Sequence, residues 1–199
     1  MPLWWHIQPS DGVVAVNEQK LLQQIAGGDE AALAALHHAY FERLVRFLYR
    51  LTADKDHIVE IVNDVFFTIW NSAEKFRGES AVSTWIMGIA YKKGLQSVSR
   101  RKVMLPLSDD DTEPLSENDN LVAERYNTQL LSQLKPHHRV VMELTYHFGF
   151  SYKEISEIVD CPENTVKTRM YHGRQQLLAL LEQEDGGQMS KLDAKASLC

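Results

Sequence analysis

Apolar residues recur along most of the chain at intervals of three and four, the spacing of one buried helix face. The pattern predicts four helices in the first half of the chain: Glu18–Ala26, Glu30–Leu51, a third that starts at Asp54 or Asp56, and a fourth from about Val82 to Arg101. Gly27-Gly28 ends the first helix and Asp29 caps the second. Two more helices, Leu121–Leu134 and Pro136–His147, follow. No stretch alternates with period two, so the sequence predicts an all-α protein.

An acidic segment divides these helices into two groups. Between Val103 and Ala123 there is no Lys or Arg but a run of Asp and Glu, and Pro106 and Pro114 prevent a continuous helix. Such a segment cannot bury enough apolar surface to fold alone, so we interpret it as a solvated spacer rather than a docking element. The predicted organisation is a disordered leader (1–16), a helical domain (17–102), a flexible acidic linker (103–120), a second helical domain (121–183) and a disordered tail (184–199).

The segment Ser151–Leu178 has the pattern of a helix-turn-helix. Its first helix carries Ile155 and Ile158 on one face, and Pro162 ends that helix and suits the first turn of the next. The second helix is expected to bury Val166, Met170, Leu177 and Leu178 and to leave Lys167, Thr168, Arg169, Tyr171, His172 and Arg174 in solvent. One packed face and one basic, polar face are what a helix needs to enter the major groove of DNA. The pattern therefore favours DNA binding and regulation over catalysis.

Composition narrows the function further. The formal net charge of the 199 residues is -6, so nucleic acid has to be bound through local basic patches, and acidic surface elsewhere suggests a protein partner. Two cysteines are too few for a disulfide framework or a thiolate zinc site and fit a reducing cytoplasm. No apolar run is long enough to span a bilayer, and Met1–Ser10 lacks the features of a secretory signal. No metal-binding, nucleotide-binding or nucleophile–base motif occurs, so we expect no metal, no cofactor and no enzyme activity.

Four segments, taken in order, resemble bacterial RNA polymerase sigma factors of the extracytoplasmic-function (ECF) group of the sigma-70 family. They are GDEAALAALHHAYFERLVRFLYRLT, DHIVEIVNDVFFTIW, FRGESAVSTWIMGIAYKKGLQSVSRR and LKPHHRVVMELTYHFGFSYKEISEIVDCPENTVKTRMYHGRQQL. The resemblance runs from about Asn17 to Glu182 and implies two domains, called region 2 and region 4, on either side of the acidic linker. It also implies an alternative sigma factor, which binds core RNA polymerase and directs promoter-specific transcription initiation.

The resemblance assigns roles to residues of the first domain. The third helix would bind the coiled coil of the polymerase's largest subunit through Glu60, Asn63 and Asp64, since exposed carboxylates suit arginine recognition. A solvated polar face is the alternative interpretation. The contact set for the minus-10 promoter element would be Arg77, Gly78, Glu79, Ser80, Ser83, Lys92, Lys93, Gln96, Arg100 and Arg101. The loop 77–83 would hold a base flipped out of the non-template strand. Trp85 has the spacing of a core residue and is left out of this set.

In the second domain, the resemblance places the second helix of the helix-turn-helix in the major groove at the minus-35 element. Its contact set would be Glu163, Asn164, Thr165, Lys167, Thr168, Arg169, His172 and Arg174. We expect Arg169 and Lys167 to donate to bases or phosphates, because bidentate Arg to guanine is the commonest specific contact. Asn164 stands where the family often has glycine and is expected to accept the same left-handed turn conformation.

The implied partners are core RNA polymerase (largest-subunit coiled coil and flap), promoter DNA and a membrane-associated anti-sigma factor that wedges between the two domains. The protein itself is expected in the cytoplasm without membrane insertion. Two other functions fit parts of the sequence. A stand-alone helix-turn-helix regulator would require dimerisation and palindromic sites. A sigma mimic that sequesters an anti-sigma factor would not need basic residues such as Lys92, Arg100 and Arg169.

Overall fold

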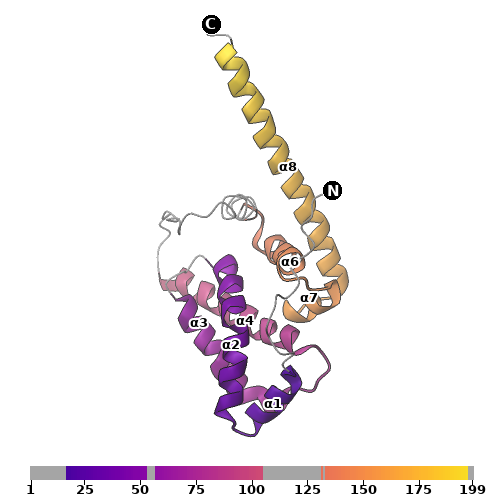
Figure 1. Cartoon of the computed structure of the whole chain (residues 1–199). Helices are drawn as coiled ribbons and strands as arrows, with labels where there is room; N and C mark the ends of the chain where they lie inside the picture. Colours follow the sequence, from indigo (N-terminus) through magenta and orange to yellow (C-terminus); the bar gives the residue numbers. More distant parts are fainter. Residues whose placement is uncertain (1–16, 53–56, 105–130, 132, 197–199) are drawn as a thin grey trace.

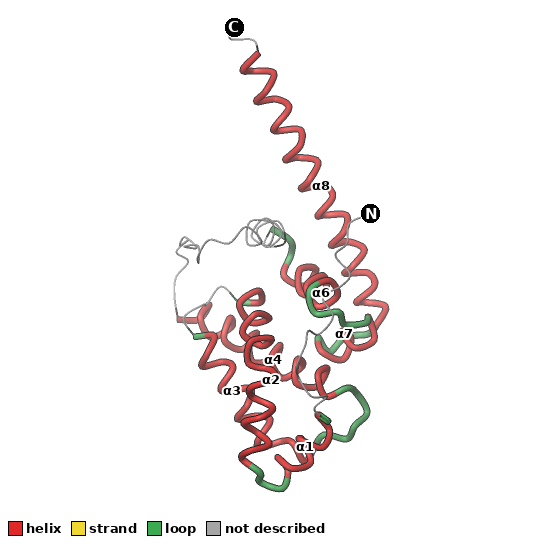
Figure 2. The backbone as a smooth tube through the Cα atoms, viewed as in Figure 1, coloured by secondary structure: helices red, strands yellow, loops and turns green. Residues whose placement is uncertain are grey.

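The computed structural model describes residues 17–52, 57–104, 131 and 133–196, and it describes only the backbone of 101–104 and 183–196. Within these ranges the secondary structure is entirely helical, which confirms the all-α prediction (Figures 1 and 2). The elements are α1 (Glu18–Ala26), α2 (Glu30–Leu51), α3 (Ile58–Ser72), the 3-10 helix η1 (Ala73–Lys75), α4 (Val82–Met104), α6 (Pro136–Tyr146), α7 (Tyr152–Ile158) and α8 (Glu163–Ala196).

Side-chain caps explain why the first two helices start where the sequence predicts. The Asn17 carboxamide oxygen accepts a hydrogen bond from the Lys20 backbone N–H at 3.0 Å. The Asp29 carboxylate accepts from the backbone N–H groups of Ala31 and Ala32 at 2.9 and 3.1 Å. The start of α3 is different, because its N-cap is His57 and makes no side-chain capping bond. The capping roles predicted for Asp54 or Asp56 lie outside the described residues.

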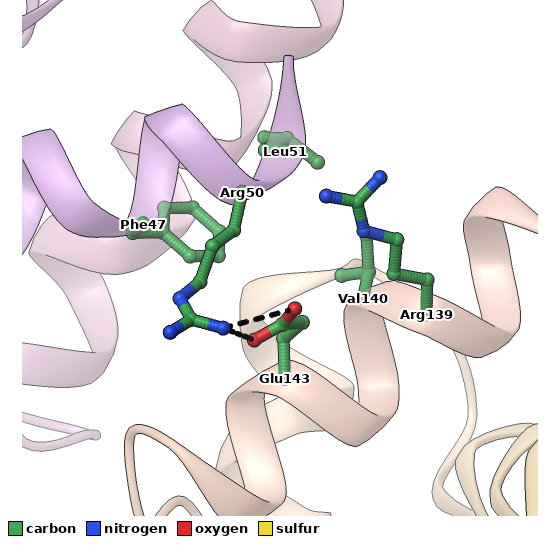
Figure 3. A pocket seen from close by; sticks show the side chains of 6 residues that line it. All are labelled: Phe47, Arg50, Leu51, Arg139, Val140 and Glu143. Atoms are coloured by element: carbon green, nitrogen blue, oxygen red, sulfur yellow. Dashed lines mark hydrogen bonds and ion pairs between the residues drawn. The ribbon is translucent and has the colours of Figure 1, made fainter. Parts of the chain in front are cut away.

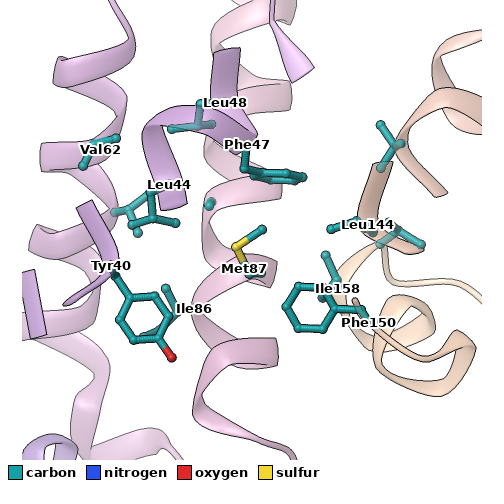
Figure 4. Close-up of a cluster of buried hydrophobic side chains, with 14 of the residues drawn as sticks. Tyr40, Leu44, Phe47, Leu48, Val62, Ile86, Met87, Leu144, Phe150 and Ile158 are labelled. Carbon is teal, nitrogen blue, oxygen red and sulfur yellow. The ribbon is translucent and has the colours of Figure 1, made fainter. Parts of the chain in front are cut away.

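The helices α1 to α4 form one bundle around an apolar interior. Leu36, Leu44 and Leu48 of α2 are fully buried, and the α3 stripe of Ile58, Ile61, Val62, Val65, Phe66 and Ile69 faces them. Ile86 and Met87 of α4 complete the interior (Figure 4). This packing leaves the opposite face of α3 and one long face of α4 at the surface, where the candidate contact residues lie.

The helices α6, α7 and α8 form the second group and contain the predicted helix-turn-helix. Val166 and Met170 of α8 are buried as predicted, whereas Leu178 is 53% exposed, so its predicted burial is wrong. Leu177 and Leu180 pack partly buried against the core, whereas Leu178 follows Leu177 directly and therefore points in a different direction on α8. The left-handed residue of the turn is Asp160, with φ of 54°, rather than Asn164, which lies in the first turn of α8. Asp is one of the few residues that tolerates this conformation.

The two groups of helices pack against each other and share one continuous core. Phe150, Leu144 and Ile158 of the second group point toward Met87 and Phe47 of the first (Figure 4). The Phe47 and Phe148 rings meet edge to face with centroids 5.5 Å apart. The predicted acidic linker, 103–120, falls almost entirely outside the described residues.

The last helix is longer than the sequence predicts. α8 continues to Ala196, past the point at 184 where we expected a disordered tail to begin (Figure 1). The expectation rested on Gly186-Gly187, but glycine costs a helix only about 1 kcal/mol per residue and does not block its backbone hydrogen bonds. α4 likewise extends to Met104 rather than ending near Arg101.

Candidate partner and nucleic-acid interfaces

The outer face of α3 presents polar residues on a helix whose other face is firmly packed. Glu60, Asn63 and Asp64 are all exposed, and in the described part of the chain neither carboxylate forms an ion pair. The same face carries two large apolar side chains that the sequence analysis did not assign, Val59 at 54% exposure and Phe67 at 69%. Residues 59, 63 and 67 are one helical turn apart, so they form one stripe. A polar rim with an uncovered aromatic is the composition of a protein-binding surface.

The exposure of Phe67, which the sequence analysis did not predict, has a simple origin. Phe66 and Phe67 are adjacent, and adjacent residues point in different directions on a helix, so only one of the two can face the bundle. Phe66 is 5% exposed and packs against the His37 ring with centroids 4.5 Å apart. An aromatic next to a core aromatic in an amphipathic helix was therefore a usable signal of an exposed contact residue.

The loop before α4 is exposed but anchored. Arg77 and Glu79 form an ion pair at 3.6 Å with both side chains mostly in solvent, and Gly78 has φ of 72°, a conformation that favours glycine. The Phe76 and Trp85 rings, with centroids 5.3 Å apart, attach the loop to the bundle. This contact agrees with the core role expected for Trp85. Of the other residues expected in this part of the minus-10 set, Ser80 precedes α4 and Ser83 lies in its first turn, so the helix begins inside the predicted loop 77–83; both side chains are half-buried.

The body of α4 brings part of the minus-10 set together. Lys92, Gln96 and Arg100 are exposed and one turn apart, so they form a single polar stripe. Lys93 is half-buried on a neighbouring face, and the Arg101 side chain is not among those described. The stripe does not stand free, because the Lys92 ammonium lies 3.5 Å from the Asp160 carboxylate in the turn of the helix-turn-helix.

The first turns of α8 present most of the minus-35 set to solvent. Glu163, Asn164, Lys167, Thr168, His172 and Arg174 are exposed, and Thr165 and Arg169 are half-buried. By helical spacing, Asn164, Thr168 and the unassigned Tyr171 lie on the face opposite the buried Val166 and Met170. Arg169 and Arg174 flank that face on opposite sides. A flat polar face with an arginine on each side suits a groove lined by phosphates.

The basic residues of α8 are held by local contacts. Lys167 pairs with Glu163 at 2.8 Å, one turn earlier. Arg169 donates to the Cys161 sulfur at 3.7 Å. The Arg174 guanidinium donates to the Tyr146 hydroxyl at 2.9 Å, a bond that raises the pKa of Arg174 above its already high value. These contacts fix the directions in which the positive charges point.

A capping box fixes the first helix of the pair. The Ser151 hydroxyl accepts from the Glu154 backbone N–H at 3.3 Å, and the Glu154 carboxylate accepts from the Ser151 backbone N–H at 2.8 Å. The hydrogen bonds from Ser151 lower the pKa of Glu154 below its ordinary value. α7 is therefore held at its N-terminus in a fixed direction, which in turn sets the position of α8.

Metal binding and membrane crossing find no support in the described residues. They contain no group of three or more His, Cys, Asp or Glu side chains placed to hold a metal ion. None of the helices seen in the described ranges has the length and apolarity needed to cross a membrane.

Comparison with known proteins finds a sigma-70 domain in each half of the chain. The family models for sigma-70 region 2 and sigma-70 region 4 match residues 36–103 and 128–177. The chain is 29% identical over 181 residues to the ECF RNA polymerase sigma-E factor of Haemophilus influenzae, which covers 81% of this chain and 94% of the relative. It is 25% identical over 176 residues to the sigma-E factor of Escherichia coli K12, and that match covers 80% of this chain and 92% of the relative.

Solved structures show the same fold. CnrH, solved in complex with the cytosolic domain of CnrY, matches with a TM-score of 0.64 and 19% identity over 83% of this chain and 97% of that one. The sigma factor RpoE of Bartonella quintana, solved with the anti-sigma factor NepR, matches with a TM-score of 0.62 and 20% identity. The match covers 75% of this chain and 96% of that one.

The arrangement of these helices and the matches to both domains define a helical promoter-specificity subunit. The chain belongs to the sigma-70 family, within its ECF group. Members of this family are transcription initiation factors, so the chain acts by binding core RNA polymerase and directing it to promoters.

Proposed function

We propose that the outer face of α3 is the surface that binds the largest-subunit coiled coil of core polymerase. Three observations support this assignment. The carboxylates of Glu60 and Asp64 are exposed and unpaired within the described residues, so they are available to arginines of a partner. Phe67 is 69% exposed beside them, although its neighbour Phe66 is buried. A buried stripe on the other side of α3 makes the helix a rigid platform. The uncovered Phe67 next to Asp64 is the observation that carries the proposal.

The DNA contacts are divided between α4 and α8 in this proposal. The α4 stripe of Lys92, Gln96 and Arg100, with the anchored loop before it, contacts the melted minus-10 element. The exposed first turns of α8 read the minus-35 duplex through Arg169 and its neighbours. Two weak modules on one chain make the spacing between the two elements part of the specificity.

Control by an anti-sigma factor in the cytoplasm completes the proposal. It is supported by the solved complex from Bartonella quintana, in which a sigma factor of the same fold is bound to the anti-sigma factor NepR. The flap of the polymerase is the expected contact of the second domain, and the anti-sigma factor is expected to be membrane-associated.

Promoter-directed transcription in vitro tests the proposal. Core polymerase is incubated with and without the purified chain on a library of genomic fragments, and transcript starts are mapped. The expected result is a set of new starts that share two upstream motifs at a fixed spacing. Folded protein that stimulates no start with a compatible core polymerase would contradict the proposal, and palindromic sites bound without polymerase would instead indicate a stand-alone regulator.

A further inference from the structure

A buried charge cluster joins the two groups of helices. Arg50 in the last turn of α2 forms an ion pair with Glu143 of α6 at 3.1 Å, and their side chains are 10% and 3% exposed. The guanidinium points across the seam at the Glu143 carboxylate (Figure 3). His147, one turn further along α6, places Nδ1 2.9 Å from the same carboxylate and Nε2 3.2 Å from Arg50. A neutral His147 with its proton on Nδ1 satisfies both contacts, so the three side chains form a closed ring of hydrogen bonds.

The energetics of such a cluster favour a single geometry. Two charges withdrawn from water gain little net stability, but leaving one of them buried without the other costs several kcal/mol. When the two groups of helices separate, however, both charges return to water and neither is stranded. The pair therefore contributes specificity to the packed arrangement, and loss of one partner penalises that arrangement alone.

The packed arrangement places the promoter-reading elements against each other. Lys92 of the α4 stripe lies 3.5 Å from Asp160, and the Thr84 hydroxyl lies 3.5 Å from the Glu154 carboxylate of α7. The backbone of Gly88 is also close to Ile158, since a Cβ at 88 would lie 3.8 Å from its Cα. The turn of the helix-turn-helix thus sits on α4.

This position opposes DNA binding by α4 through charge. The Lys92–Asp160 pair is largely exposed and contributes little to stability. Its effect is to place a carboxylate beside the stripe that has to accept phosphates. In the packed arrangement a single strand has to compete with Asp160 for Lys92, and Asp160 is carried by the second group of helices.

We propose that the buried Arg50–Glu143 pair, completed by His147, is a latch that specifies the closed arrangement of the free protein, in which Asp160 of the helix-turn-helix is paired with Lys92 of the minus-10 stripe. Assembly with polymerase and promoter requires this latch to open. The part of this inference that concerns polymerase rests on the proposed function, whereas the closed state of the free chain does not.

The test measures the distance between the two groups of helices in the full chain without polymerase. Spin labels are attached at Lys20→Cys in α1 and Gln175→Cys in α8, both exposed, in a background with Cys161→Ser and Cys199→Ser. The parent is expected to give one narrow distance distribution by pulsed electron spin resonance. Glu143→Gln and Arg50→Gln are expected to broaden it and shift it to longer distances.

The matched control is Glu42→Gln, which also neutralises the glutamate of a Glu–Arg ion pair, but the Glu42–Arg46 pair is exposed and lies within α2. It should leave the distribution narrow. Helical circular dichroism of each variant separates opening from unfolding, because an opened chain keeps its helices. A broad distribution in the parent, or a narrow one in both latch variants with helices intact, would overturn the latch.

Affinity for core polymerase tests the inhibitory role separately. If the closed state is the dominant one, opening raises the competent fraction, and the apparent Kd of Glu143→Gln should fall by about tenfold. Opening without any gain in affinity would reject inhibition by the latch. If no variant and no parent binds polymerase, the proposed function fails, while the distance measurement still decides whether the chain is latched.

Discussion

Gly173 of α8 lies directly against Met142 of α6, with no room for a methyl group between them. A Cβ at 173 would lie 2.8 Å from the Met142 sulfur and 3.4 Å from the His138 Cβ. Glycine inside a helix costs about 1 kcal/mol relative to alanine, so this position trades local helix stability for a close helix crossing. The crossing holds α8 on α6 and thereby sets the direction of the DNA-facing side chains.

Replacing this glycine should destabilise the protein. Gly173→Ala gains about 1 kcal/mol of helix propensity but overpacks the α6–α8 contact, which typically costs about 1–3 kcal/mol. We expect a lower denaturation midpoint measured by circular dichroism. The control is Gly88→Ala in α4, where the added Cβ would be in ordinary contact at 3.8 Å. That variant should be neutral or slightly more stable; equal destabilisation of both would contradict the packing argument.

The starts of α1 and α2 and the buried stripes could be predicted because local chemistry determines them. Asn17 and Asp29 are caps, and a stripe such as Val62 and Val65 repeats at the helical period, so each is visible within one segment. Leu178 shows the limit of the same method. Leu177 continues the face of Val166 and Met170 and packs partly buried on the core, whereas Leu178, one residue further, points in a different direction, so an adjacent apolar pair does not place both members on the buried face.

The exposed Phe67 should be required for polymerase binding and dispensable for folding. Phe67→Ala removes an uncovered aromatic, and truncation of such anchors at interfaces commonly costs more than about 1.4 kcal/mol, a tenfold rise in Kd. Surface substitutions change stability by less than about 0.5 kcal/mol, so its thermal unfolding should match the parent. Affinity for core polymerase is measured by fluorescence anisotropy. Leu178→Ala, at 53% exposure on α8, is the control and should bind normally; an unchanged Kd for Phe67→Ala would remove α3 from the interface.

Phosphate contacts by the α4 stripe should be measurable in the salt dependence of promoter binding. If Lys92 contacts a phosphate in the open promoter complex, Lys92→Ala removes one counterion-releasing contact and lowers the slope of log K against log salt by about 1. Binding of the holoenzyme to a promoter fragment is measured over a series of salt concentrations. Lys20→Ala, an exposed lysine of α1, serves as the control and should keep the parental slope. A parental slope for Lys92→Ala would show that this lysine makes no phosphate contact.

The contact between the two groups of helices could not be predicted from the sequence. Arg50 and Glu143 belong to helices of different domains, and each looks like a polar residue at the edge of an apolar stripe. Charged side chains are rarely buried unless paired, and the partner is known only once the helices are packed. The resemblance to a two-domain family, with a spacer between the domains, also gave no reason to expect a shared core.

The capping box of α7 should make stability depend on acid. Hydrogen bonds from Ser151 lower the pKa of Glu154, so its contribution is fully present above the ordinary carboxyl pKa and is lost as the pH falls through the lower, folded-state pKa. In Glu154→Gln this carboxyl no longer titrates, so the free energy of unfolding should fall less on acidification than in the parent. Urea midpoints between neutral and acidic pH measure it, with Glu157→Gln on the same helix as the control for loss of a surface carboxylate. An unchanged pH profile in Glu154→Gln would show that the box contributes no such linkage. Ser151→Ala should cost about 1 kcal/mol at neutral pH.

A hydrogen bond between α1 and α2 should make stability depend on alkaline pH as well. The buried Tyr40 hydroxyl donates to the Glu18 carboxylate at 2.6 Å. Burial, that hydrogen bond and the charge of Glu18 raise the pKa of Tyr40. The phenol therefore ionises more easily in the unfolded chain, and stability should fall as the pH rises past the ordinary tyrosine value of about 10. Tyr40→Phe should lose about 1 kcal/mol at neutral pH, because the hydrogen bond is gone, and should also lose its share of the alkaline decline. Thermal unfolding from neutral pH to about pH 11 measures both effects, and Tyr171→Phe, whose ring is 60% exposed, is the control. An alkaline decline of the same size in Tyr40→Phe and the parent would show that this phenol does not couple folding to pH.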